Sequence, residues 1–208
     1  MWAFVHITKT GGTGIEEFVR LHPECRIVGG GHKHTESTYE QRRVPRIFTV
    51  VRDPVDRFHS AFNYWKTGAL TGTYKRSAFQ KSEHQRVYPT LGSFIDALVK
   101  RSLLAESVLK HAMGFTWHDH FDQQVKWLNG VHRSTWLLCY DHQNLIRNTN
   151  AFLNATQNNC SLPNRLVNPS VSYNRENLTN RQLAWIEANY ANDFALWARC
   201  KGRSFVKL

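Results

Sequence analysis

Residues 4–18 read FVHITKTGGTGIEEF, which is an apolar start followed by a glycine turn and an amphipathic stretch. The pattern predicts a β-strand, a tight turn and the beginning of a helix. Glycines let backbone N–H groups converge on an anion because no Cβ is in the way, and the N-terminus of the next helix adds partial positive charge. We therefore predict an anion-binding loop. Its candidate residues are Lys9, Thr10, Gly11, Gly12, Thr13 and Gly14.

This loop differs from the Walker A phosphate loop. The G-x-x-x-x-G-K-[ST] pattern is absent, and Lys9 precedes the glycines instead of following them. An ordinary kinase or ATPase is therefore disfavoured. Taken alone, the stretch is also compatible with a plain strand-to-helix turn that binds nothing.

A second stretch, residues 47–62, reads IFTVVRDPVDRFHSAF. We predict that a strand ends at Arg52 and that Asp53 and Pro54 start a helix as its cap and first residue. Arg52 would then project from the carboxyl end of a strand, which is the usual ligand side of an open α/β sheet. Arg52 and Ser60 could jointly hold a second phosphate, the arginine by its fork and the serine by its hydroxyl.

Short apolar runs alternate with helical patterns along the chain, which favours a mostly parallel sheet with helices on its faces. The predicted strands cover residues 2–7, 26–28, 46–51 and 135–140. The predicted helices cover residues 13–21, 55–65, 91–100, 121–128, 143–153 and 180–198. We predict a single α/β domain over residues 1–208, because no repeat or linker divides the chain.

Composition narrows the classes of function. The chain has 208 residues with 27 Lys and Arg against 16 Asp and Glu, so its net charge is +11 and part of its surface should attract polyanions. No apolar run is long enough to span a bilayer, and no signal peptide is recognisable. Among the four cysteines, Cys139 lies in an apolar run and is expected to be a buried free thiol. A bridge between Cys160 and Cys200 is a candidate that the sequence does not decide.

The pair K-T-G-G-T (residues 9–13) and V-R-D-P-x-x-R-x-x-S (residues 51–60) resembles the 5′-phosphosulfate and 3′-phosphate loops of sulfotransferases that use 3′-phosphoadenosine 5′-phosphosulfate (PAPS). The resemblance is greatest to Golgi-type carbohydrate enzymes, particularly heparan sulfate 2-O- and 6-O-sulfotransferases. It continues more weakly through residues 120–124, 139–141 and 168–170. It implies a P-loop-like sulfotransferase fold with PAPS as co-substrate, 3′-phosphoadenosine 5′-phosphate (PAP) as product and no metal.

The chain departs from that family at three points. Thr8 stands where a proline is common, and Gly14 where a Ser or Thr usually follows the loop. The membrane anchor and stem of the Golgi enzymes are missing from this sequence. We expect no membrane span and leave the location open: cytoplasmic if this is the whole protein, and the Golgi lumen if it belongs to a longer one.

Residues 29–36 read GGGHKHTE and follow the second predicted strand. Related glycan sulfotransferases carry their catalytic histidine in a G-H or H-x-H element at this place. Histidine suits the role of general base because its ordinary pKa lies near working pH. We assign His32 as the base, with His34 as the nearest rival and Glu36 as a third candidate. Lys9 would offset negative charge on the departing nucleotide.

The predicted function is therefore transfer of a sulfuryl group from PAPS to a hydroxyl of an acceptor. The expected acceptor is a carbohydrate or another hydroxyl compound, and an acidic glycan is one candidate. Acceptor specificity is expected in residues 66–89 and around Trp117. The alternative is a non-catalytic basic module that binds nucleic acid or heparin-like polyanions. No recognisable nucleic-acid-binding motif favours that alternative, so no nucleic acid partner is expected.

Overall fold

The computed structural model describes residues 2–29, 46–68, 86–111, 118–128, 135–140, 144–156, 160–162 and 178–208. The chain forms two compact units. Unit 1 comprises Met1–Asp53, Gln123–Ser172 and Asn192–Leu208, and unit 2 comprises Pro54–Asp122 and Tyr173–Ala191. This division does not test whether the chain folds as one domain, so the single domain stays a prediction.

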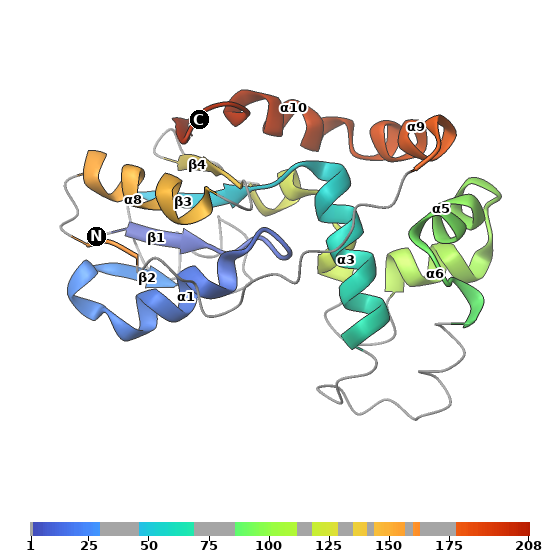
Figure 1. Ribbon diagram of the computed structural model, residues 1–208, viewed down its shortest axis with the longest axis horizontal. Coiled ribbons are helices and arrows are strands. Elements are labelled where there is room, and N and C mark those ends of the chain that lie inside the picture. Colours follow the sequence, from blue (N-terminus) through green and yellow to red (C-terminus); the bar gives the residue numbers. More distant parts are fainter. Residues whose placement is uncertain are drawn as a thin grey trace. The chain divides into compact units, whose positions relative to one another are not determined.

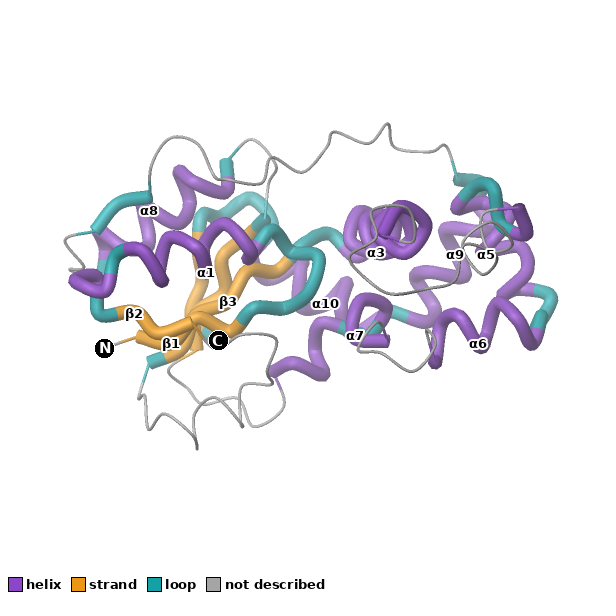
Figure 2. Tube along the Cα trace, turned by 90° about the horizontal axis from the view of Figure 1, so that it is seen from below, coloured by secondary structure: helices purple, strands orange, loops and turns teal. Residues whose placement is uncertain are grey.

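Unit 1 is built on one sheet, whose strands lie one above another in Figure 1 and are seen from below in Figure 2. The strand order is β2-β1-β3-β4-β5, and the first four strands run parallel while β5 is antiparallel to β4. The predicted α/β class with a mostly parallel central sheet is confirmed. The strands are β1 (Trp2–Val5), β2 (Ile27–Gly29), β3 (Ile47–Val51), β4 (Thr135–Cys139) and β5 (Phe205–Lys207).

Helices cover both faces of this sheet. Because successive strand residues point to opposite faces, Phe48 and Val50 of β3 join one core and Val51 joins another. The first core includes apolar side chains of α1 (Gly12–Leu21) and α8 (Leu145–Ala155). The second includes side chains of the 3₁₀ helix η3 (Gln124–Leu128) and of α10 (Ala191–Cys200). Strands covered on both faces are mostly apolar, and β1 and β3 are fully buried, with Thr49 as the one polar residue of β3.

Unit 2 is helical in its described part. It contains α3 (Pro54–Gly68), α5 (Leu91–Val99), α6 (Leu103–His111), α7 (His118–Phe121) and α9 (Asn180–Asn189). Aromatic side chains pack its interior. Phe94 contacts Phe58 and Phe62 with ring centroids 6.3 and 5.5 Å apart. Such pairs add to the stabilisation that burial of the rings already provides.

Two predicted helices are wrong in their extent. The helix expected over residues 121–128 is replaced by α7, which ends at Phe121, and by η3. The helix expected over residues 180–198 is broken at Tyr190, where the backbone leaves helical geometry with φ −124° and ψ 25°. The Tyr190 hydroxyl donates a hydrogen bond to the carbonyl oxygen of Phe121 at 2.6 Å. The break in a periodicity that the sequence carries without interruption thus coincides with a tertiary contact of the same residue.

The disulfide also differs from the candidate. Cys160 pairs with Cys25, which ends the 3₁₀ helix η1 (Pro23–Cys25) after α1, and not with Cys200. Cys139 and Cys200 are both free and buried, so the expectation for Cys139 is confirmed and the Cys160–Cys200 bridge is wrong. Both cysteines of the bridge belong to the core that α1 and α8 cover. Within the described ranges, the helices are too short or too polar to cross a membrane.

Candidate functional site

The glycine turn and Arg52 follow neighbouring parallel strands. From β1 the chain crosses to β2 on one side, and β3 then pairs with β1 on its other side, so the strand order reverses between β1 and β3. In open α/β sheets, ligands bind outside the carboxyl ends of the strands at such a switch point. Lys9 lies beyond the end of β1, and Arg52 directly follows β3. The topology thus brings both predicted anion-binding elements to the switch-point crevice of unit 1, the place outside the carboxyl ends of β1 and β3.

The backbone of the glycine turn is left-handed at two positions. Lys9 has φ 63° and Gly11 has φ 83°, while Thr10 between them has an ordinary negative φ. Alternation of negative and positive φ is typical of anion-binding nests, in which successive N–H groups turn toward one side. Helix α1 begins immediately afterwards at Gly12, and its N-cap Gly11 supplies no side-chain cap. Its first turn carries no acidic residue, so nothing there repels an anion from the helix N-terminus.

Both glycines at the start of α1 are enclosed by aromatic rings. A Cβ on Gly11 would lie 2.6 Å from Cε2 of Tyr140, and a Cβ on Gly12 would lie 2.3 Å from Cδ2 of His6. Neither position has room for a side chain. His6 is buried, and its Nδ1 lies 3.6 Å from a carboxylate oxygen of Glu16.

The two threonines of the loop have different surroundings. Thr10 is fully buried, and its hydroxyl donates a hydrogen bond to the carbonyl oxygen of Ile7 at 2.8 Å. A hydroxyl has a single proton to donate, so the Thr10 side chain stabilises the turn itself. The prediction of Thr10 as a binding residue consequently rests on its backbone N–H. Thr13 is exposed and Gly14 is buried, both within α1.

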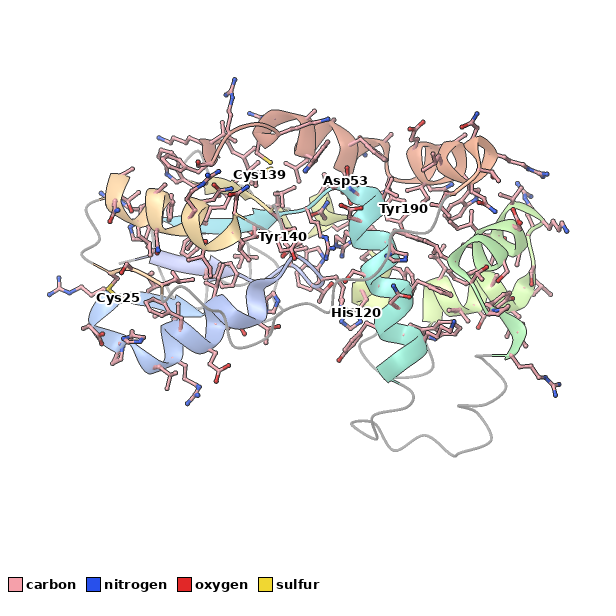
Figure 3. All side chains as sticks on the ribbon, viewed as in Figure 1. Cys25, Asp53, His120, Cys139, Tyr140 and Tyr190 are labelled. Carbon is pink, nitrogen blue, oxygen red and sulfur yellow. A yellow bond between two sulfur atoms is a disulfide. The ribbon has the colours of Figure 1, made fainter. Side chains whose placement is uncertain are left out.

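Arg52 lies against the glycine turn. Its Nη1 donates a hydrogen bond to the carbonyl oxygen of Lys9 at 3.3 Å, and its Cζ lies 4.6 Å from the centre of the Tyr140 ring. A guanidinium over an aromatic face at this distance gains about 0.5–1 kcal/mol. Tyr140 directly follows β4, where Figure 3 labels it beside Cys139. Its ring therefore contacts both elements, Gly11 on the turn and Arg52 after β3.

The predicted partner of Arg52 belongs to the other unit. Ser60 lies on α3 in unit 2 and is half-buried. Its partnership with Arg52 stays a prediction. Arg57, also on α3, is buried and donates to the carbonyl oxygen of Asp122 at 2.6 Å within unit 2.

The candidate bases His32, His34 and Glu36 lie outside the described residues, and so does most of the segment 66–89. The structure describes the strand before the histidines. β2 ends at Gly29, which pairs with Phe4 of β1 in parallel register. The chain thus leaves β2 toward residues 30–45 at the same edge of the sheet that carries the glycine turn and Arg52.

Sequence reasoning missed two residues of the crevice. Tyr140 could have been found by the rule that selected Arg52, because it stands at the carboxyl end of a predicted strand. Gln124 carries no such signal. It lies in a polar stretch, yet it is fully buried and its side chain binds the backbone of Arg52.

Within the described part of the chain, no group of three His, Cys, Asp or Glu side chains is placed to hold a metal ion. Comparisons of the chain with protein-family models, with curated proteins and with solved structures find no match.

Proposed function

We propose that this protein is a PAPS-dependent sulfotransferase that transfers a sulfuryl group to a hydroxyl of an acceptor. The proposed acceptor is a carbohydrate. One observation carries the proposal. Arg52 Nη1 lies 3.3 Å from the carbonyl oxygen of Lys9, so the two motifs that resemble donor-binding loops are in contact at the switch point of a parallel sheet. If either motif had occurred in the sequence by chance, nothing would require the two motifs to lie in contact.

The donor carries anionic groups at the 5′ and 3′ positions of its ribose, and the crevice offers two kinds of group that bind anions. The amides of the glycine turn and the N-terminus of α1 suit the 5′-phosphosulfate, and Lys9 supplies a full positive charge beside them. The guanidinium of Arg52 matches the geometry of a phosphate and is assigned to the 3′-phosphate. We also propose, as part of this function, that unit 1 has a P-loop-like architecture.

The proposed reaction is an in-line displacement at sulfur. The acceptor oxygen forms a new bond to sulfur while the bond between sulfur and the bridging phosphate oxygen breaks, and PAP departs with the bonding electrons. The proton of the acceptor hydroxyl passes to His32, with His34 and Glu36 as the other candidates. Lys9 stabilises the negative charge that develops on the bridging oxygen. In this scheme, the role of the described residues is to hold and orient the donor. None of the steps is assigned to a metal.

The charge of the protein is compatible with acidic ligands. A net charge of +11 attracts both a nucleotide with several anionic oxygens and a carboxylated or sulfated glycan. Charge does not select the acceptor, so the proposal names the class of reaction and leaves the sugar and its sulfated position to experiment.

The experiment has a binding step and a transfer step. Isothermal titration calorimetry with PAP tests the donor site, and radiolabelled PAPS with a panel of glycans tests transfer. We expect PAP to bind and label to appear on at least one glycan. Absence of PAP binding together with absence of transfer would overturn the proposal, and salt-sensitive binding of DNA or heparin without any response to PAP would favour the non-catalytic basic module instead.

A further inference from the structure

The side chain of Gln124 forms a paired hydrogen bond with the backbone of Arg52. Its Oε1 accepts from the Arg52 N–H at 2.9 Å, and its Nε2 donates to the Arg52 carbonyl oxygen at 2.9 Å. Gln124 is fully buried, so neither bond competes with water. One amide side chain thus satisfies both backbone groups of the first residue after β3.

This arrangement continues the sheet by one residue. On the other side of β3, the N–H of Tyr140 donates to the carbonyl oxygen of Val51 at 2.7 Å, which is the last backbone bond in register. Beyond it, the Gln124 side chain forms the two hydrogen bonds with Arg52 that the backbone of a neighbouring strand would otherwise form. A backbone bonded through both its N–H and its C=O has little rotational freedom. The direction in which the Arg52 side chain leaves the sheet is accordingly restricted.

Gln124 is itself held by a buried carboxylate. Its backbone N–H donates to Oδ2 of Asp193 at 2.7 Å, and the N–H of Val125 donates to Oδ1 of Asp193 at 3.0 Å. Asp193 lies in the first turn of α10 and is fully buried. Hydrogen bonds from backbone amides to an ionised group are stronger than bonds between neutral groups. The carboxylate therefore anchors η3, from which the Gln124 side chain reaches Arg52.

We infer that Gln124 is a positioning residue that holds Arg52 for the 3′-phosphate of the donor. The inference rests on the proposed function and deepens it, because it explains how this chain would distinguish a 3′-phosphorylated adenine nucleotide from one without that phosphate. Binding groups must be held to within a fraction of an ångström, and this depends on the residues that support them. Gln124 touches the backbone of Arg52 and is assigned no contact with substrate.

The test compares two nucleotides that differ at one position. Calorimetry gives the Kd of PAP and of adenosine 5′-monophosphate, which lacks the 3′-phosphate, for the wild type, Arg52→Gln and Gln124→Met. The wild type should prefer PAP, and Arg52→Gln should reduce this preference. Gln124→Met keeps the size of the side chain but removes both hydrogen bonds. We expect it to weaken PAP binding about tenfold or more, with little change for the monophosphate.

Gln182→Met is the matched control. Gln182 is also buried, and its amide also binds backbone groups, donating to the carbonyl oxygen of Gly92 at 3.3 Å and accepting from the N–H of Thr179 at 2.9 Å. Those bonds lie in unit 2 and involve no residue of the crevice. We expect Gln182→Met to lower stability without changing the ratio of the two dissociation constants. A change of ratio equal to that of Gln124→Met would overturn the inference.

The outcomes separate the two proposals. A wild type that binds both nucleotides equally, or neither, contradicts the proposed function. A wild type that prefers PAP, with the preference intact in Gln124→Met, contradicts only the role of Gln124. If Gln124→Met loses its circular dichroism spectrum, Gln124→Glu replaces it, because it keeps an acceptor for the Arg52 N–H and places a carboxylate oxygen against the Arg52 carbonyl. Failure of both variants to fold would make Gln124 a residue of the core and overturn the inference.

Discussion

The ring of Tyr140 occupies the space that a side chain at Gly11 would need. A Cβ on Gly11 would lie 2.6 Å from Cε2 of Tyr140 and 3.0 Å from Cδ2 of Leu145. Gly11 also has φ 83°, a conformation that side chains disfavour. The same ring lies against the guanidinium of Arg52, so the packing that excludes a side chain at Gly11 also supports the arginine.

Gly11→Ala should lower the free energy of unfolding by more than the left-handed backbone at this position accounts for. The left-handed conformation costs an alanine about 1–2 kcal/mol, and the overlap with Tyr140 adds about 1–3 kcal/mol. Gly202→Ala is the matched control, because Gly202 has φ 77° but a Cβ there would meet nothing within 4 Å. Urea unfolding of both variants measures the difference. Equal losses of unfolding free energy would contradict the close approach of Tyr140.

Lys9→Ala should abolish most sulfuryl transfer while the fold is kept. Removal of one group that stabilises developing negative charge lowers kcat by about 10²–10³-fold in other enzymes. Lys9 is half-buried and already left-handed, so alanine adds no new backbone strain there. Lys100→Ala, an exposed lysine at the end of α5, serves as the control for lost positive charge. Initial rates of transfer from labelled PAPS are measured for both variants. Equal rates in the two would remove Lys9 from the mechanism.

The assignment of His32 predicts a separation between two neighbouring histidines. His32→Ala should lose transfer activity and keep PAP affinity, because a general base acts on the acceptor and not on the donor. His34→Ala should retain most of the rate. Calorimetry with PAP and initial-rate assays measure the two quantities. Full activity in His32→Ala with loss in His34→Ala would transfer the role to His34, and full activity in both would direct attention to Glu36→Gln.

The disulfide predicts a specific peptide and a large effect of its removal. Cys25 and Cys160 are 135 residues apart in the sequence, so their bond restricts a long loop of the unfolded chain. The double variant Cys25→Ala/Cys160→Ala should lower the free energy of unfolding by about 2–5 kcal/mol. Mass spectrometry of a digest made without reduction should find Cys25 linked to Cys160. A peptide linking Cys160 to Cys200 would contradict the structure.

Stability should fall at alkaline pH because of a buried thiol. A hydrogen bond with the side chain of Cys139 and burial together raise the pKa of Cys200 far above its ordinary value. Cys200 therefore stays protonated in the folded state, whereas in the unfolded chain it ionises above about pH 8.5. Its contribution is fully present below that pH and decreases above it, by up to about 1.4 kcal/mol per pH unit.

Urea unfolding between neutral and strongly alkaline pH measures this contribution. Other groups also titrate in the range, so the informative quantity is the difference between the wild type and Cys200→Ala. We expect the wild type to lose stability more steeply than the variant. Parallel pH profiles would mean that the Cys200 thiol ionises as readily in the folded state as in the unfolded one.

The strands were predictable because their signal is local. Residues 46–51 and 135–140 are apolar runs of strand length, and β3 and β4 occupy them to within one residue at either end. β5 was not predicted, since three residues at the edge of a sheet leave no periodic pattern. Helices α6 and α7 were also missed, and the break at Tyr190 coincides with a hydrogen bond to Phe121, which lies 69 residues away in the sequence.

The sequence by itself determined the α/β class and the two loops at strand ends, because strand patterns, glycine turns and capping residues act over a few neighbouring positions. Only the tertiary structure decided which cysteine Cys160 meets, that Tyr140 contacts both Gly11 and Arg52, and that Gln124 holds the backbone of Arg52. These are contacts between residues far apart in the chain. They depend on strand order and on the packing of helices against the sheet, and no short stretch of sequence encodes either one.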